Sequence, residues 1–213
     1  MNEPRIYHVF NRSIANYTIF NSREEYSRMM TSIRYYSHNN LPISLSYLLV
    51  DEGKGKLEEI ISDPCNKIVN LIAYCLMPTH LHLILELDKE KFVSIFMNNL
   101  QNSYTRFFNL RHKRRGPLWE GRYKKVLVKT DEQLLHLTRY VHLNPVTANL
   151  IRKPEDWEFS SYKEYLGKTK EKICSYEKYI DVEVKGYKKF NEDRIGYQRQ
   201  LAQIKKYLFD EPM

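Results

Sequence analysis

Residues 68–87, IVNLIAYCLMPTHLHLILEL, decide the fold. The stretch consists of two apolar segments, 68–76 and 80–87, separated only by the residues MPT. Parallel strands need a crossover of a dozen or more residues, whereas antiparallel strands can be joined by a tight turn. We therefore predict an antiparallel β-hairpin at this point of the chain.

The second predicted strand carries two histidines, His80 and His82, separated by a single residue. Because side chains alternate along a strand, we expect both imidazoles on one face and Leu81 and Leu83 on the other. Two imidazoles at this spacing can share a divalent metal ion. Two hydrogen-bonded histidines within a sheet would give the same pattern, so the pair alone leaves both interpretations open.

The segments around the hairpin extend the pattern to β-α-β-β-α-β, the order of a ferredoxin-like unit. They comprise a strand at 5–11, helices at 21–36 and 90–109, a strand at 122–130 and a helix from 131 that Pro145 ends. We therefore predict an α+β fold, in which helices pack on one face of a ferredoxin-like antiparallel sheet.

Two segments fall outside this unit. Residues 37–67 match none of its elements, and we interpret them as an insertion within a domain of residues 1–167. Residues 168–213 form a C-terminal extension rich in Lys, Glu and Tyr. Its apolar spacing favours a helix over 192–209, so we expect the extension to be helical.

The composition indicates which binding partners and which cellular compartment to expect. The 213-residue chain has 34 Lys and Arg against 26 Asp and Glu, a net charge of +8, which favours an anionic partner such as nucleic acid. No apolar run reaches the ~18 residues of a membrane helix, and the start MNEPRIYHVF lacks a signal-peptide pattern. We therefore expect a cytoplasmic protein without a membrane partner. Three cysteines without CxxC spacing indicate neither a disulfide framework nor a cysteine zinc site.

The predicted helix from 131 carries a second polar pattern. His136, Tyr140 and Asn144 recur every four residues, so they lie on nearly one stripe, separate from the apolar stripe. A tyrosine flanked by possible metal ligands has the arrangement that a nucleophilic phenol needs for attack on a phosphate. A surface or interface tyrosine would show the same spacing.

A basic segment precedes that helix. Between residues 106 and 129 there are nine Lys and Arg residues and one acid, Glu120, with aromatic residues interleaved. Cations that follow phosphates and rings that stack on bases suit single-stranded nucleic acid. A solvated loop whose aromatic residues enter the core would have the same composition. The candidate contacts are Arg114, Arg115, Trp119, Arg122, Tyr123, Lys124 and Lys125.

Six stretches of the chain together resemble one known family, the HUH single-tyrosine transposases, and within it the REP-associated tyrosine transposases (RAYT). They are YHVFNR at 7–12, AYCLMPTHLHLIL at 73–85, NLQNSYTRFFN at 99–109, GPLWEGRYKKVLV at 116–128, LLHLTRYVHLNPVTANL at 134–150 and DWEFSSYKEYLG at 156–167. An HxH pair alone is a weak signal, but these motifs in this order are specific. Thr79 departs from the family, which commonly has Asn before the first histidine.

The resemblance implies a ferredoxin-like enzyme, a DNA endonuclease and transferase that nicks single-stranded DNA and transfers strands in DNA transposition and recombination. Tyr140 would form a 5′-phosphotyrosine intermediate, and His80, His82 and Asn144 would bind Mg²⁺ or Mn²⁺. The substrate would be single-stranded DNA with a hairpin or palindromic repeat, and the protein would be a monomer or a homodimer.

Further residues in the matching stretches are candidates with weaker roles. Asn11 and Arg12 join the candidate DNA contacts. His8 is either such a contact or a histidine packed within the sheet, and His136 either assists proton transfer near Tyr140 or faces solvent.

Two other classes of function compete with a transposase. One is a non-catalytic single-stranded nucleic-acid-binding protein on the same fold, which would not need the two histidines, the tyrosine and the asparagine together. The other is an unrelated metal-binding ferredoxin-like protein, which would not need the basic GPLWEGRYK stretch. Cleavage of hairpin DNA discriminates the three classes.

Overall fold

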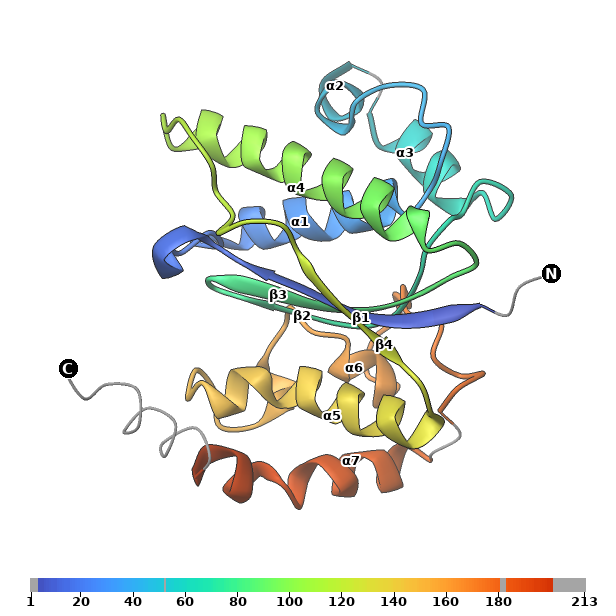
Figure 1. The fold of residues 1–213 in the computed structure, drawn as a ribbon, viewed down its shortest axis with the longest axis vertical. Helices are drawn as coiled ribbons and strands as arrows, with labels where there is room; N and C mark the ends of the chain where they lie inside the picture. Colours follow the sequence, from blue (N-terminus) through green and yellow to red (C-terminus); the bar gives the residue numbers. More distant parts are fainter. Residues whose placement is uncertain (1–3, 52, 181–182, 201–213) are drawn as a thin grey trace.

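The computed structural model describes residues 4–51, 53–180 and 183–200. At its centre is a four-stranded antiparallel sheet in the order β2-β3-β1-β4 (Figure 1). The strands are β1 (Arg5–Arg12), β2 (Asn70–Met77), β3 (His80–Leu87) and β4 (Lys124–Val128). This order is that of a ferredoxin-like unit, so the predicted fold class is confirmed.

Helices cover both faces of the sheet, and the expectation of one covered face is wrong. The helices α1 (Arg23–Tyr36) and α4 (Lys91–Arg111) lie on one side, and α5 (Asp131–Thr147), α6 (Tyr162–Tyr165) and α7 (Val184–Glu192) lie on the other (Figure 1). The reason is the composition of β2 and β3, in which all residues after the first are buried. β2 in particular is apolar on both faces after Asn70, and such a strand cannot leave one face in water.

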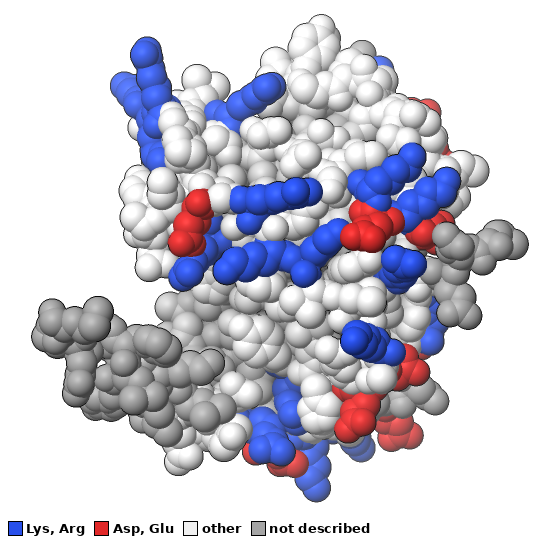
Figure 2. Space-filling view, in the orientation of Figure 1, with Lys and Arg blue, Asp and Glu red and all other residues white. Residues whose placement is uncertain are grey.

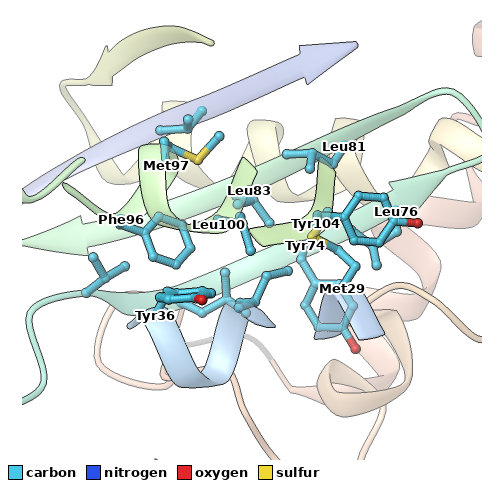
Figure 3. Packing of buried hydrophobic residues seen from close by; sticks show 14 of the residues in the cluster. Met29, Tyr36, Tyr74, Leu76, Leu81, Leu83, Phe96, Met97, Leu100 and Tyr104 are labelled. Atoms are coloured by element: carbon cyan, nitrogen blue, oxygen red, sulfur yellow. The ribbon is translucent and has the colours of Figure 1, made fainter. Parts of the chain in front are cut away.

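Two clusters of buried side chains fill the spaces between these layers. Under α1 and α4, Met29, Phe96 and Leu100 pack on Leu81 and Leu83 of β3 (Figure 3). Under α5 and α6, a second cluster covers the opposite face of β2 and β3. The leucines that alternate with His80 and His82 therefore anchor the hairpin in the first core and leave the histidines on the α5 side.

The predicted insertion forms two short helices away from the histidine face. The helices α2 (Leu45–Asp51) and α3 (Gly53–Ser62) contact α4 and α1, respectively. A short 3-10 helix, Ile14–Asn16, follows β1, and another spans Pro154–Asp156.

The C-terminal extension packs against the domain. Its backbone crosses β2, where the Ser175 N–H donates to the Leu71 carbonyl at 2.8 Å, and helix α7 then lies along α5. The Tyr187 hydroxyl bonds to Thr138 and His142 of α5 at 2.9 and 2.7 Å. Of the helix predicted over 192–209, residues 195–200 are helical and 201–209 lie outside the described residues.

Helix α5 runs to Thr147 and does not end at Pro145 as predicted. Because Pro145 lies in the last turn, its missing N–H costs a single backbone hydrogen bond there. The turn closes through bonds from the Ala148 N–H to the Asn144 carbonyl and from the Leu150 N–H to the Pro145 carbonyl, both 2.9 Å long. None of the helices within the described ranges is long and apolar enough to cross a membrane.

Candidate active site

His80 and His82 lie on the same face of β3, as the alternation predicts. Across the sheet they face Arg12 and Phe10 of β1, and their ring centroids are 5.2 Å apart with the planes nearly perpendicular. Both rings line a cavity of about 520 Å³. The cavity lies on the α5 side of the sheet, opposite the core leucines.

Each of the two imidazoles is held through its Nδ1 atom. His82 Nδ1 is 3.0 Å from His8 Nε2, and His80 Nδ1 is 3.0 Å from the hydroxyl of Thr79, the residue that departs from the family pattern. A partner on Nδ1 fixes the ring and presents Nε2, as is usual for histidines that bind metals. These two nitrogen donors can bind a divalent cation, but the described residues bring together no group of three or more His, Cys, Asp and Glu side chains that could hold one.

Burial keeps these imidazoles neutral. It lowers the pKa of His8 and of His80 to about 4, and it lowers the pKa of His82 well below the usual value. A neutral imidazole retains the lone pair that binds a metal, so no proton has to be displaced at neutral pH.

His8 is thereby placed as a positioning residue for His82. Replacing it with alanine should weaken Mn²⁺ binding about 10- to 100-fold, because His82 loses the partner that orients its ring. Calorimetric titration of the protein with Mn²⁺ measures the effect, and His136→Ala, a change outside the cavity, serves as control. An unchanged affinity in His8→Ala would show that the contact has no such role.

Tyr140 reaches the same cavity from α5. Its side chain is 44% exposed, and its ring meets His82 edge-on with the centroids 5.6 Å apart. Burial raises the pKa of the phenol, and a hydrogen bond from Asn144 partly offsets this rise. The phenol is therefore protonated at neutral pH and must lose its proton when it acts as a nucleophile.

The other two members of the predicted stripe do not line the cavity. The Asn144 amide donates to the Tyr140 carbonyl at 2.8 Å, one turn along the helix. His136 contacts Arg139 at 2.7 Å and packs against Phe190 of α7, so it faces away from the cavity. The roles of Asn144 as a ligand and of His136 as an accessory group stay predictions.

Three basic residues among the candidate DNA contacts border the cavity, namely Arg12, Arg122 and Lys124. All three are exposed, and Figure 2 shows Lys and Arg side chains in a row across the middle of the molecule, with acidic side chains among them. Asn11 also borders the cavity, but it is buried, and its amide holds the Gly121 carbonyl at 3.0 Å. It therefore positions the loop before Arg122.

Two other basic candidates are engaged elsewhere. Lys125 pairs with Glu90 and lies over the Tyr7 ring on the α4 side of the sheet. The Arg114 guanidinium donates hydrogen bonds to the Asn109 side chain and to the Pro117 carbonyl, within its own loop. Arg115 is exposed but does not line the cavity.

The two aromatic candidates are buried, and the prediction that they stack on bases is wrong. Trp119 is 8% exposed and packs near Tyr104 in the first core. Tyr123 is 6% exposed, and its hydroxyl bonds to Ser94 at 2.9 Å. Tyr123 lies between two exposed cations, Arg122 and Lys124, and alternation along the backbone turns its ring inward. Trp119 enters the core together with its neighbour Leu118.

Phe10 and Asn16 also line the cavity, and the sequence did not single them out. Strand alternation could have indicated Phe10, because it lies two residues after His8 in the first strand and therefore on the same face of the sheet. Asn16 has a φ of 53° beside Ala15 at 50°, a backbone conformation that no motif in the sequence announces.

The fold thus combines a ferredoxin-like sheet, an HxH pair on a central strand and a tyrosine on the facing helix. Residues 44–144, which include both histidines and Tyr140, match the family model described as Transposase IS200 like. The resemblance to a transposase family is therefore confirmed over this part of the chain.

A curated Haemophilus influenzae protein, named as a candidate REP-associated tyrosine transposase, is 28% identical over 101 residues, which are 43% of this chain. The match spans 57% of the length of that relative.

Among solved structures, a REP-associated tyrosine transposase bound to a REP hairpin matches with a TM-score of 0.54 and 14% identity. The match covers 86% of this chain and 88% of the other, and it establishes likeness of fold. A transposase-like protein from Deinococcus radiodurans matches with a TM-score of 0.39 and 14% identity, over 66% of this chain and 91% of the other.

Proposed function

We propose that the chain is a transposase that nicks single-stranded DNA and transfers the cut strand through Tyr140, at a hairpin or palindromic repeat. One observation carries the proposal: the phenol of Tyr140 shares a cavity with two neutral, oriented histidines and three exposed cations. The family model is consistent with it, because its match includes the histidines and the tyrosine.

The cavity would hold Mg²⁺ or Mn²⁺ on His80 and His82, with the Asn144 amide oxygen as a proposed further ligand. Such an ion, when bound, would polarise the scissile phosphate and neutralise part of its charge. Arg12, Arg122 and Lys124 would bind the neighbouring phosphates and hold the strand in register.

In the proposed reaction, the phenolic oxygen of Tyr140 attacks the phosphorus and forms a new O–P bond. The bond from phosphorus to the 3′ oxygen breaks, the phenol loses its proton, and the released 3′ oxygen gains one. The product is a 5′-phosphotyrosine and a free 3′-hydroxyl. Because the covalent bond conserves the energy of the cut one, a 3′-hydroxyl can later attack it and rejoin strands without ATP.

The full chain incubated with labelled hairpin-containing single-stranded DNA and Mg²⁺ or Mn²⁺ tests this proposal. We expect an adduct that survives denaturing electrophoresis, and peptide mapping should place it on Tyr140. Tight binding without an adduct on any hairpin tested would favour the non-catalytic nucleic-acid-binding protein. Both histidines and the tyrosine come from one chain, so either a monomer or a homodimer could carry a complete site.

Glu120 should act against DNA binding. It lies at the cavity and pairs with Arg12, so a phosphate must compete with its carboxylate for the guanidinium. Both partners are about half exposed, so the pair is worth at most ~1 kcal/mol, and Glu120→Gln should tighten DNA binding about two- to fivefold at low salt. Fluorescence anisotropy measures the change, with Glu132→Gln on the exposed start of α5 as control. A gain that persists unchanged at high salt would contradict this electrostatic explanation.

A further inference from the structure

An aromatic ring forms part of the cavity wall beside the histidines. Phe10 of β1 stands between His82 of β3 and Lys124 of β4 in the register of the sheet. Its ring centroid is 4.8 Å from that of His8 and 5.9 Å from that of His82. Directly opposed residues share one face of an antiparallel sheet, so the phenyl ring, the imidazole and the ammonium group face the same space.

Phe10 differs in kind from the groups around it. Most of the other described residues that line the cavity are polar or charged, and a second aromatic ring there belongs to Tyr140, the proposed nucleophile. Leu81 also contributes, but it is fully buried in the leucine core on the other face. Phe10 is only partly buried, so it offers an apolar face within a cationic cavity. A phosphate gains nothing from contact with an apolar ring, whereas a nucleobase can stack on it, because each base has a flat π-surface.

We propose that Phe10 is the stacking platform for the nucleobase next to the cleaved phosphate, and that this nucleotide enters the cavity unstacked from its neighbours. The inference rests on the proposed function and adds the form of substrate that the site accepts. A cavity of about 520 Å³ lies within the range that encloses a small ligand. With the base on Phe10, the phosphates on either side lie near the exposed cations Arg12, Arg122 and Lys124.

Asn16 is placed to contact the edge of that base. It lines the same cavity, is exposed, and follows Ala15 in a left-handed backbone conformation with φ near 50°. Non-glycine residues rarely adopt this conformation, and it is frequent where a loop must present a side chain to a ligand. An amide can donate to and accept from a base edge, so Asn16 supplies selectivity among bases while Phe10 supplies affinity.

Equilibrium binding in EDTA tests the stacking platform independently of cleavage. The probes are hairpin oligonucleotides with single-stranded flanks, each with one 2-aminopurine at a different flank position. We expect one position whose fluorescence is quenched by the wild-type protein. Phe10→Leu should remove that quenching and weaken binding about 5- to 100-fold, whereas Phe10→Trp should retain both. The matched control is Phe92→Leu, a partly buried phenylalanine of α4 outside the cavity.

The outcomes separate this inference from the proposed function. If wild-type protein forms the Tyr140 adduct but Phe10→Leu binds as tightly as Phe92→Leu, the stacking platform is wrong and the transposase stands. If quenching depends on Phe10 but no hairpin yields an adduct, the base site stands and the proposed chemistry fails. Equal Mn²⁺ affinity and equal melting temperature of Phe10→Leu and wild type would show that the loss is not one of folding.

Discussion

Replacing Tyr140 with phenylalanine should abolish the protein–DNA adduct and lower strand cleavage by ~10³-fold or more, while DNA affinity stays within about twofold. The substitution deletes only the hydroxyl oxygen that would attack phosphorus. The ring is 44% exposed and keeps its edge-on contact with His82, so the fold and the cavity should persist. The measurements are adduct formation on denaturing gels and DNA binding by anisotropy.

A second tyrosine provides the matched control. Tyr17 has a similar exposure, 46%, but does not line the cavity, so Tyr17→Phe should cleave DNA like the wild type. An adduct that persists in Tyr140→Phe and maps to another tyrosine would overturn the assignment of the nucleophile. Loss of DNA binding in Tyr140→Phe would mean that the phenol serves recognition more than chemistry.

Replacing His80 with alanine should remove cleavage almost completely, with a loss of ~10²-fold or more, and should weaken Mn²⁺ binding, while metal-free DNA binding is spared. The reason is that one of two neutral imidazoles in the cavity is lost, whereas the nearby cations are untouched. Single-turnover cleavage and Mn²⁺ titration measure the two effects.

The wild-type protein in EDTA is the reference for this variant. Both samples should bind hairpin DNA equally and cut it equally poorly. Cleavage that survives in His80→Ala and still responds to EDTA would place the metal on other residues. Unchanged Mn²⁺ affinity would remove His80 from the ligand set.

The parts of the site that could be predicted from the sequence are those fixed by local geometry. The hairpin follows from two apolar segments with a short turn, and strand alternation puts His80 and His82 on one face. The helical stripe places Tyr140 and Asn144 on one side of α5. That Tyr140 lies over His82 depends on the packing of α5 across β2 and β3, which no local pattern encodes, and the resemblance to a family supplied that link.

The wrong predictions share a different cause. The sequence alone does not tell which side of a loop or strand faces water in the folded protein. Trp119 and Tyr123 both lie in the basic segment of residues 106–129, yet both are buried in the core. Phe10 is the opposite case. An apolar residue in an alternating strand is expected to be buried, but the ring of Phe10 lines the cavity and is only partly buried. The covering of both sheet faces could have been inferred from β2, whose residues after Asn70 are apolar on both sides.

The contact between α7 and α5 has a genetic consequence. Tyr187 supplies the hydroxyl that bonds to the buried Nδ1 of His142, and Phe190 packs under the Arg139 guanidinium at 4.0 Å. A nonsense codon after Gly167 would spare every candidate site residue, yet it would remove the hydroxyl partner of His142 and the apolar side chains, Tyr187 among them, that pack against α5. Helix α7 is thus coupled to the helix that carries Tyr140, and a mutation that removes α7 is equivalent to a substitution in the core.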